Sequence, residues 1–141
     1  MSLELLGENI YTRIYQRLLD VIPDLLTIEE SGKSEVDGLM PLNLNVIQRT
    51  PEKLVIALSH YFRHGSSEMI AYSNMEIVVY ISHEMAELLT YQDAYVFNSG
   101  YSPDRSHANF SAKQALNDFV HAWLGNLIAQ GHSIKMKIDH D

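Results

Sequence analysis

The sequence of 141 residues contains no cysteine. This absence excludes disulfide bonds, thiol catalysis and zinc sites with cysteine ligands, and it is typical of proteins from a reducing cytoplasm. The first residues lack the basic and then apolar segments of a secretory signal peptide, so we expect none. No apolar run reaches the length of about 18 residues that a membrane helix needs. The composition therefore predicts a cytoplasmic protein with no membrane partner.

Basic residues are scarce, with 10 lysines and arginines against 18 acidic residues and a formal net charge of −8. A field of that sign repels phosphate backbones, so we expect no nucleic-acid partner. The glycine-rich phosphate-binding loops and the GxSxG turn of serine hydrolases are also absent. The sequence thus indicates no cofactor and no catalytic residue, and favours a protein that is not an enzyme.

Hydrophobic residues make up 46% of the chain, enough for a packed core in one domain spanning residues 1–141. Apolar residues at every fourth position predict a helix over about 8–22, which Pro23 ends. A second stripe predicts a helix over about 111–130, with a capping box at Ser111 and Gln114 and a C-terminal cap at Gly131.

Between these helices the apolar residues alternate with a period of two, which is typical of half-buried strands. The strands are predicted at about 41–48, 53–63, 69–81 and 86–97, and residues 29–40 and 98–110 are predicted loops. Short links between strands favour an antiparallel meander. The tail, 132–141, alternates and suggests a fifth, edge strand. We therefore predict an α+β fold, an antiparallel sheet of four or five strands with both helices packed on one face.

His83-Glu84-x-x-Glu87 differs by one residue from the HExxH pattern of zinc proteases. A metal site on a helix would place His83, Glu84 and Glu87 together, but the strand periodicity on both sides favours a hairpin turn at residues 82–85. His60 and His64 are a second pair of possible ligands. In a strand they lie about 13 Å apart, too far to share one ion. We therefore predict no metal site, with His83, Glu84 and Glu87 as the weaker alternative.

Several motifs lie in the same order as in a known family. They are Leu58-x-His60-Tyr61-Phe62, Asn74-Met75-Glu-Ile77-Val-Val-Tyr80, Ala86-Glu87 and Lys113-x-x-x-Asn117-x-Phe119-x-x-x-Trp123-Leu124. With them the chain resembles the YqiB-like proteins, an uncharacterised bacterial group also known as domain of unknown function 1249. The resemblance implies the order helix, four strands, helix and a cytoplasmic bacterial protein. It implies no reaction.

The residues that match this pattern are the candidate binding residues: Tyr80, Glu87, Lys113, Asn117, Trp123, His60 and Tyr61. A structural interpretation competes with this one. Asn117 and Lys113 would then bond to the sheet, while Tyr80 and Trp123 would pack between helix and sheet.

Two functions follow from these features. Val55, Ala57 and Val78, with Tyr61 and Tyr80, predict a partly apolar second face of the sheet, which is often an interaction surface. The first hypothesis is therefore a non-enzymatic binding or adaptor protein that uses this face or a sheet edge, with another protein or a second copy as partner. The alternative is a small enzyme or small-molecule binder, with a pocket between sheet and helices lined by Glu87, His60, Tyr80 and Asn117.

Overall fold

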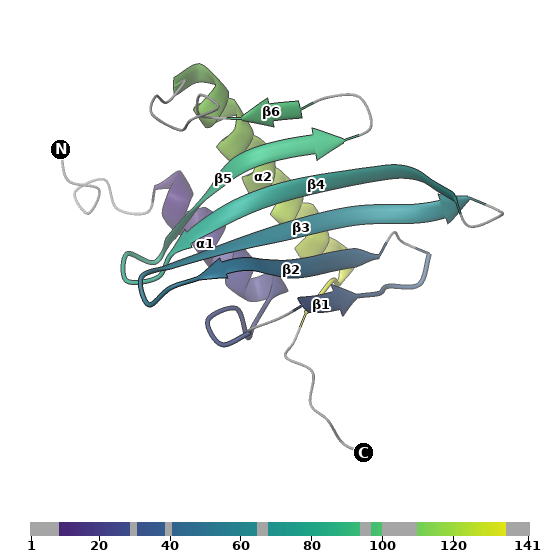
Figure 1. The fold of residues 1–141 in the computed structure, drawn as a ribbon, viewed down its shortest axis with the longest axis horizontal. Coiled ribbons are helices and arrows are strands. Elements are labelled where there is room, and N and C mark those ends of the chain that lie inside the picture. Colours follow the sequence, from purple (N-terminus) through teal and green to yellow (C-terminus); the bar gives the residue numbers. More distant parts are fainter. Residues whose placement is uncertain are drawn as a thin grey trace, which may run out of the picture.

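The computed structural model describes residues 9–28, 31–38, 41–64, 68–93, 97–99 and 110–134. They form two layers, an antiparallel sheet and two helices that cross one of its faces (Figure 1). The helices are α1 (Ile10–Val21) and α2 (Phe110–Gln130). The strands are β1 (Ser31–Ser34), β2 (Leu42–Arg49), β3 (Lys53–His64), β4 (Glu68–Tyr80), β5 (Met85–Asp93) and β6 (Phe97–Ser99).

The six strands lie side by side in chain order, and every neighbouring pair is antiparallel. The predicted α+β class and the meander are thus confirmed, and the two helices pack on the same face as expected. Neither helix, within the described part of the chain, is long and apolar enough to cross a membrane.

Details at the ends of the sheet differ from the prediction. Strand β1 forms inside the predicted loop 29–40, and the single strand predicted over 86–97 is divided into β5 and β6. Helix α2 begins at Phe110, so Ser111 lies within its first turn and is not the N-terminal cap. Residues 135–141, where most of the suggested tail strand would lie, fall outside the described residues.

The helix ends follow the local chemistry. The Asn9 side chain accepts hydrogen bonds from the backbone N–H groups of Tyr11 and Thr12 at the start of α1. At the end of α2, Gly131 adopts a positive φ of 90°. The N–H of His132 bonds to the carbonyl of Leu127, and that of Gly131 to the carbonyl of Ile128. This is the glycine cap predicted from the sequence, and it turns the chain back toward the sheet.

Alternation along the central strands decides which side chains meet the helices. The core residues of β3 and β4 are fully or almost fully buried against both helices: Leu54, Ile56, Leu58, Met75, Ile77 and Val79. Ile14 and Leu18 of α1, and Val120 and Leu124 of α2, fill the other side of this layer and are also inaccessible. The main core therefore lies between the sheet and the helix pair.

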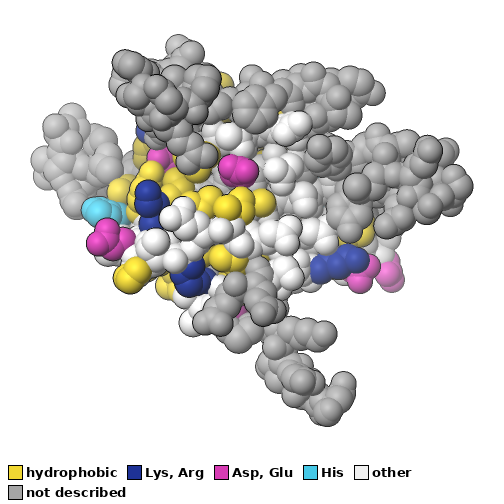
Figure 2. Space-filling view, in the orientation of Figure 1, with side chains coloured by type: hydrophobic (Ala, Val, Ile, Leu, Met, Phe, Trp, Pro, Cys, Tyr) yellow, Lys and Arg dark blue, Asp and Glu magenta, His cyan; other side chains and the backbone are white. Residues whose placement is uncertain are grey.

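The second face of the sheet, opposite the helices, carries its own small apolar cluster. Val55, Val78 and Leu89 are 8%, 3% and 6% exposed, and Tyr80 packs against them. Figure 2, which views this face, shows hydrophobic side chains grouped over part of the sheet, beside uncharged atoms and a few acidic and basic side chains. Strand alternation and register assign five uncharged polar side chains to the second face: Asn43, Asn45, Ser59, Asn74 and Gln92. The face is therefore partly apolar, as predicted. Its remainder is mostly neutral and polar but also includes the charged residues Lys53 and Glu76.

Candidate functional site

The His83-Glu84-x-x-Glu87 segment forms the turn between β4 and β5. The N–H groups of His83 and Glu84 bond back to the carbonyls of Tyr80 and Ile81, at 3.2 and 3.3 Å. The His83 and Glu84 side chains are exposed, whereas Glu87 is only 4% exposed on β5. In the described residues no group of three or more His, Cys, Asp or Glu side chains could hold a metal ion. The segment is therefore a hairpin turn, and its three side chains do not converge.

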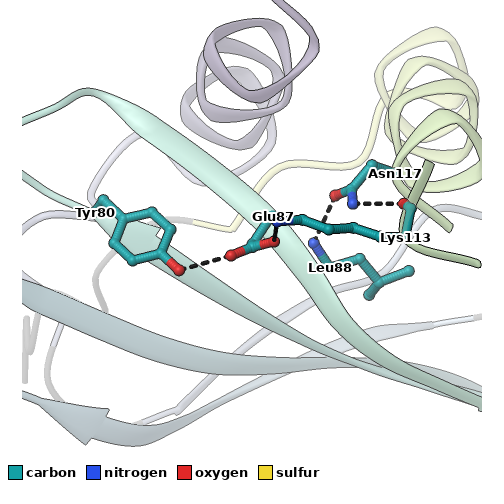
Figure 3. Close-up of polar contacts among 5 residues, drawn as sticks. All are labelled: Tyr80, Glu87, Leu88, Lys113 and Asn117. Carbon is teal, nitrogen blue, oxygen red and sulfur yellow. Dashed lines mark hydrogen bonds and ion pairs between the residues drawn. The ribbon is translucent and has the colours of Figure 1, made fainter. Parts of the chain in front are cut away.

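Glu87 is instead the centre of a polar network at the edge of the sheet (Figure 3). The Tyr80 hydroxyl donates to one carboxylate oxygen at 2.6 Å, and the Lys113 ammonium lies 3.2 Å from the other. The Glu87 side chain is 5% exposed and that of Lys113 22%. Both carboxylate oxygens thus have partners, which is the arrangement that a buried acid requires.

Asn117 joins this network to the backbone of β5. Its side-chain oxygen accepts the N–H of Leu88 at 2.8 Å, and its amide nitrogen donates to the carbonyl of Lys113 at 2.7 Å (Figure 3). β6 pairs with β5 only from Thr90 to Gln92, so the N–H of Leu88 lies on a stretch of edge that β6 does not cover. Asn117, which is 1% exposed, satisfies that donor and closes the edge.

A pocket of about 390 Å³ adjoins the network, between the first turns of the two helices. It is lined by Ile10, Tyr11, Lys113, Gln114, Asn117 and Asp118. The Lys113 ammonium lies 5.5 Å from the centre of the Tyr11 ring, within the range of a cation–π contact. The lining thus combines an aromatic ring, an amide, a carboxylate and a cation, a set that can bind a small polar molecule.

A second polar cluster lies near the other end of α2, on the helix side of the sheet. The His60 ring on β3 meets the rings of Trp123 and His132, each with centroids 5.6 Å apart. Nδ1 of His132 is 2.9 Å from the hydroxyl of Ser34, which also accepts the N–H of Ser133 at 3.0 Å. Both histidine Nε2 atoms are buried, and neither has a hydrogen-bond partner among the residues that the structure describes.

Burial controls the charge of these two rings. It lowers the pKa of both His60 and His132 from the ordinary value of 6.5, and the neighbouring His132 lowers that of His60 further. Desolvation disfavours the imidazolium, so both rings are neutral at neutral pH.

Acid is therefore expected to destabilise the fold through this pair. Each folded-state pKa lies below the unfolded value, so the unfolded chain binds more protons than the folded one. The stability that is present above about pH 6.5 is therefore lost as the pH falls toward the folded pKa. Urea unfolding of chelator-treated protein should show this decline, and it should be weaker in His132→Gln. His83→Gln, in the exposed turn, should keep the wild-type decline. An unchanged decline in His132→Gln would contradict this assignment.

The structure brings four of the predicted site residues together and separates the others. Tyr80, Glu87, Lys113 and Asn117 form the edge network. His60 and Trp123 belong to the histidine cluster, and Tyr61 lies on β3 with its side chain outside the described part of the structure. Ser34 and His132 escaped the sequence analysis because one lies in a predicted loop and the other follows a helix cap, where no periodicity marks a buried residue.

Comparison with known proteins identifies the family. The model of the family described as "Protein of unknown function (DUF1249)" matches residues 17–133, well over half of the chain, and the chain belongs to this family. No curated protein and no solved structure matches it. The matched range includes both polar clusters, and the predicted membership of domain of unknown function 1249 is confirmed.

Proposed function

We propose that this member of the DUF1249 family is a non-enzymatic binding protein that contacts another protein through the second face of its sheet. The observation that carries the proposal is the apolar character of the face opposite the helices, where Val55, Val78 and Leu89 cluster beneath the half-buried Tyr80. In a sheet with one covered face, the other is usually polar, so an apolar group there is unusual. Protein interfaces have such apolar centres with few charges.

The chemistry around the cluster supports a polypeptide as partner. Neutral side chains such as Asn45 and Asn74 share this face and offer hydrogen bonds, while Lys53 and Glu76 border the cluster as the charged rim of an interface would. The formal charge of −8 favours a partner less acidic than this chain, and thus another protein over a second copy. The lack of cysteine and the likeness to YqiB-like proteins support a cytoplasmic, bacterial setting as part of the same proposal.

Photo-crosslinking in cells that make the protein naturally tests the proposal. A photoreactive amino acid at Asn45, exposed on the second face, should give a discrete adduct with one other protein. The same group at Ala122, exposed on α2, should not give it, and Val55→Thr should weaken it by replacing a methyl group of the cluster with a hydroxyl. Three outcomes would overturn the proposal. They are equal adducts at both positions, no adduct at either, and an adduct with twice the mass of this chain.

The second candidate function is a small-molecule binder or small enzyme that uses the pocket between the helix starts. The observation that favours it is the volume of about 390 Å³, within the range of ligand pockets. Of the four residues that the sequence suggested for such a pocket, Asn117 lines it, Tyr80 and Glu87 lie in the adjoining network, and His60 lies in the other cluster. A metabolite that raises the melting temperature of the wild type but not of Gln114→Ala would favour this function.

A further inference from the structure

The histidine cluster contains two buried nitrogen atoms without a partner among the described residues. Nε2 of His60 and Nε2 of His132 are both shielded from solvent, and neither makes a hydrogen bond within the described part of the chain. Buried polar atoms in native proteins are nearly always satisfied, so an atom left over calls for an explanation such as a water molecule or an ion. His132 itself is only 3% exposed. Because the two rings are adjacent, both atoms are candidates for one shared ligand.

The distance between the rings fits a single metal ion. A zinc–nitrogen bond of about 2.0–2.1 Å puts the ion about 3.2 Å from each ring centroid. Two imidazoles on one tetrahedral ion then have centroids about 5.2 Å apart, and two on opposite sides of an ion about 6.4 Å. The centroids of His60 and His132 are 5.6 Å apart, between these limits.

The surroundings of His132 resemble those of a metal-binding histidine. Such a ring usually donates its second N–H to an oxygen, which fixes the tautomer and leaves the other nitrogen as ligand. The Ser34 hydroxyl lies 2.9 Å from Nδ1 and can accept this N–H, while the N–H of Ser133 fixes the hydroxyl at 3.0 Å. The backbone N–H groups of His132 and Ile134 bond to Leu127 and Val21, which anchors the segment on both sides of the ring.

We propose that His60 and His132 bind one divalent transition-metal ion through their Nε2 atoms. Imidazole nitrogen favours zinc, copper and nickel over magnesium or calcium, so zinc is the appropriate probe. No third His, Cys, Asp or Glu side chain joins the pair among the residues that the structure describes, and water completes the coordination. Burial lowers the pKa of both rings, and the neutral form that it favours is the form that binds metal.

The single tryptophan of the chain, Trp123, provides a direct readout because its ring contacts His60. Chelator-treated protein is titrated with Cu²⁺, which quenches indole fluorescence at short range, and Zn²⁺ is then added as competitor. We expect quenching that saturates at one equivalent and that an excess of Zn²⁺ shifts to higher Cu²⁺ concentration, because copper binds nitrogen ligands more tightly than zinc. His60→Gln and His132→Gln should each weaken Zn²⁺ binding about tenfold or more, and Ser34→Ala should also weaken it. His83→Gln, in the exposed turn, should bind as the wild type does.

X-ray absorption at the zinc edge measures the zinc–ligand distances in the wild-type protein. This measurement needs no variant, so it does not depend on whether the variants fold. Two imidazole nitrogens at about 2.0–2.1 Å would support the site. Wild-type affinity in folded His60→Gln and His132→Gln, or no saturable binding at one equivalent, would overturn it. A bridging water molecule would then account for the two nitrogens.

Discussion

Replacing Lys113 with methionine is expected to lower the free energy of unfolding by about 3 kcal/mol. Removing one partner of a buried ion pair costs about 3–5 kcal/mol, because the remaining charge is buried without compensation. The Glu87 side chain is 5% exposed, so its charge would stay buried after Lys113 is replaced. We expect the low end of the range, since the Tyr80 hydroxyl still donates to Glu87 at 2.6 Å and Lys113 was itself 22% exposed. Urea unfolding at neutral pH measures the difference.

The double variant Lys113→Met with Glu87→Gln is the matched control. It removes both charges and keeps a side chain to which Tyr80 can still donate, so most of the lost stability should return. Glu87→Gln alone should cost less than Lys113→Met, because the long Lys113 side chain is partly exposed and can turn its ammonium to water. A cost below about 1 kcal/mol for Lys113→Met would mean that the pair behaves like a surface ion pair.

The order and type of the long elements were predictable because each depends on local periodicity. Leu54, Ile56 and Leu58 recur at every second position, as the core face of a strand requires. The stripe that includes Val120 and Leu124 shows the helical period in the same way. The short strands β1 and β6 carry no such signal. With four residues (Ser31–Ser34) and three residues (Phe97–Ser99), they form because a neighbouring strand offers hydrogen bonds, which is a tertiary effect.

The candidate site was predictable only in part, because most of its contacts depend on tertiary packing and not on local periodicity. The hairpin turn after Tyr80 brings Glu87 back beside it, and the sequence indicated that turn. The approach of Lys113 and Asn117 depends on where α2 crosses the edge of β5. The contact of Ser34 with His132 depends on two chain segments that no local pattern connects. Residue identity thus suggested which side chains matter, and helix docking decided which of them meet.

The two faces of β4 are expected to differ in their contribution to stability, and Val78 and Val79 allow a matched comparison. Val79 is 0% exposed in the main core, whereas Val78 is 3% exposed in the three-residue cluster of the second face. Val79→Ala removes apolar surface and leaves a cavity between sheet and helices, so we expect a loss of roughly 2–3 kcal/mol. For a domain of this length, that lowers the melting temperature by several degrees.

Val78→Ala removes the same atoms from the same strand, with the same change in strand propensity. The difference between the two losses of unfolding free energy therefore reports only on the face of the sheet that each valine occupies. We expect about half the cost, because the cluster around Val78 is small and can relax, unlike the densely packed layer around Val79. Equal costs would mean that the second face is as fully packed as the core. A face packed in that way would have no apolar surface left for a partner, so this outcome would count against the proposed binding function as well.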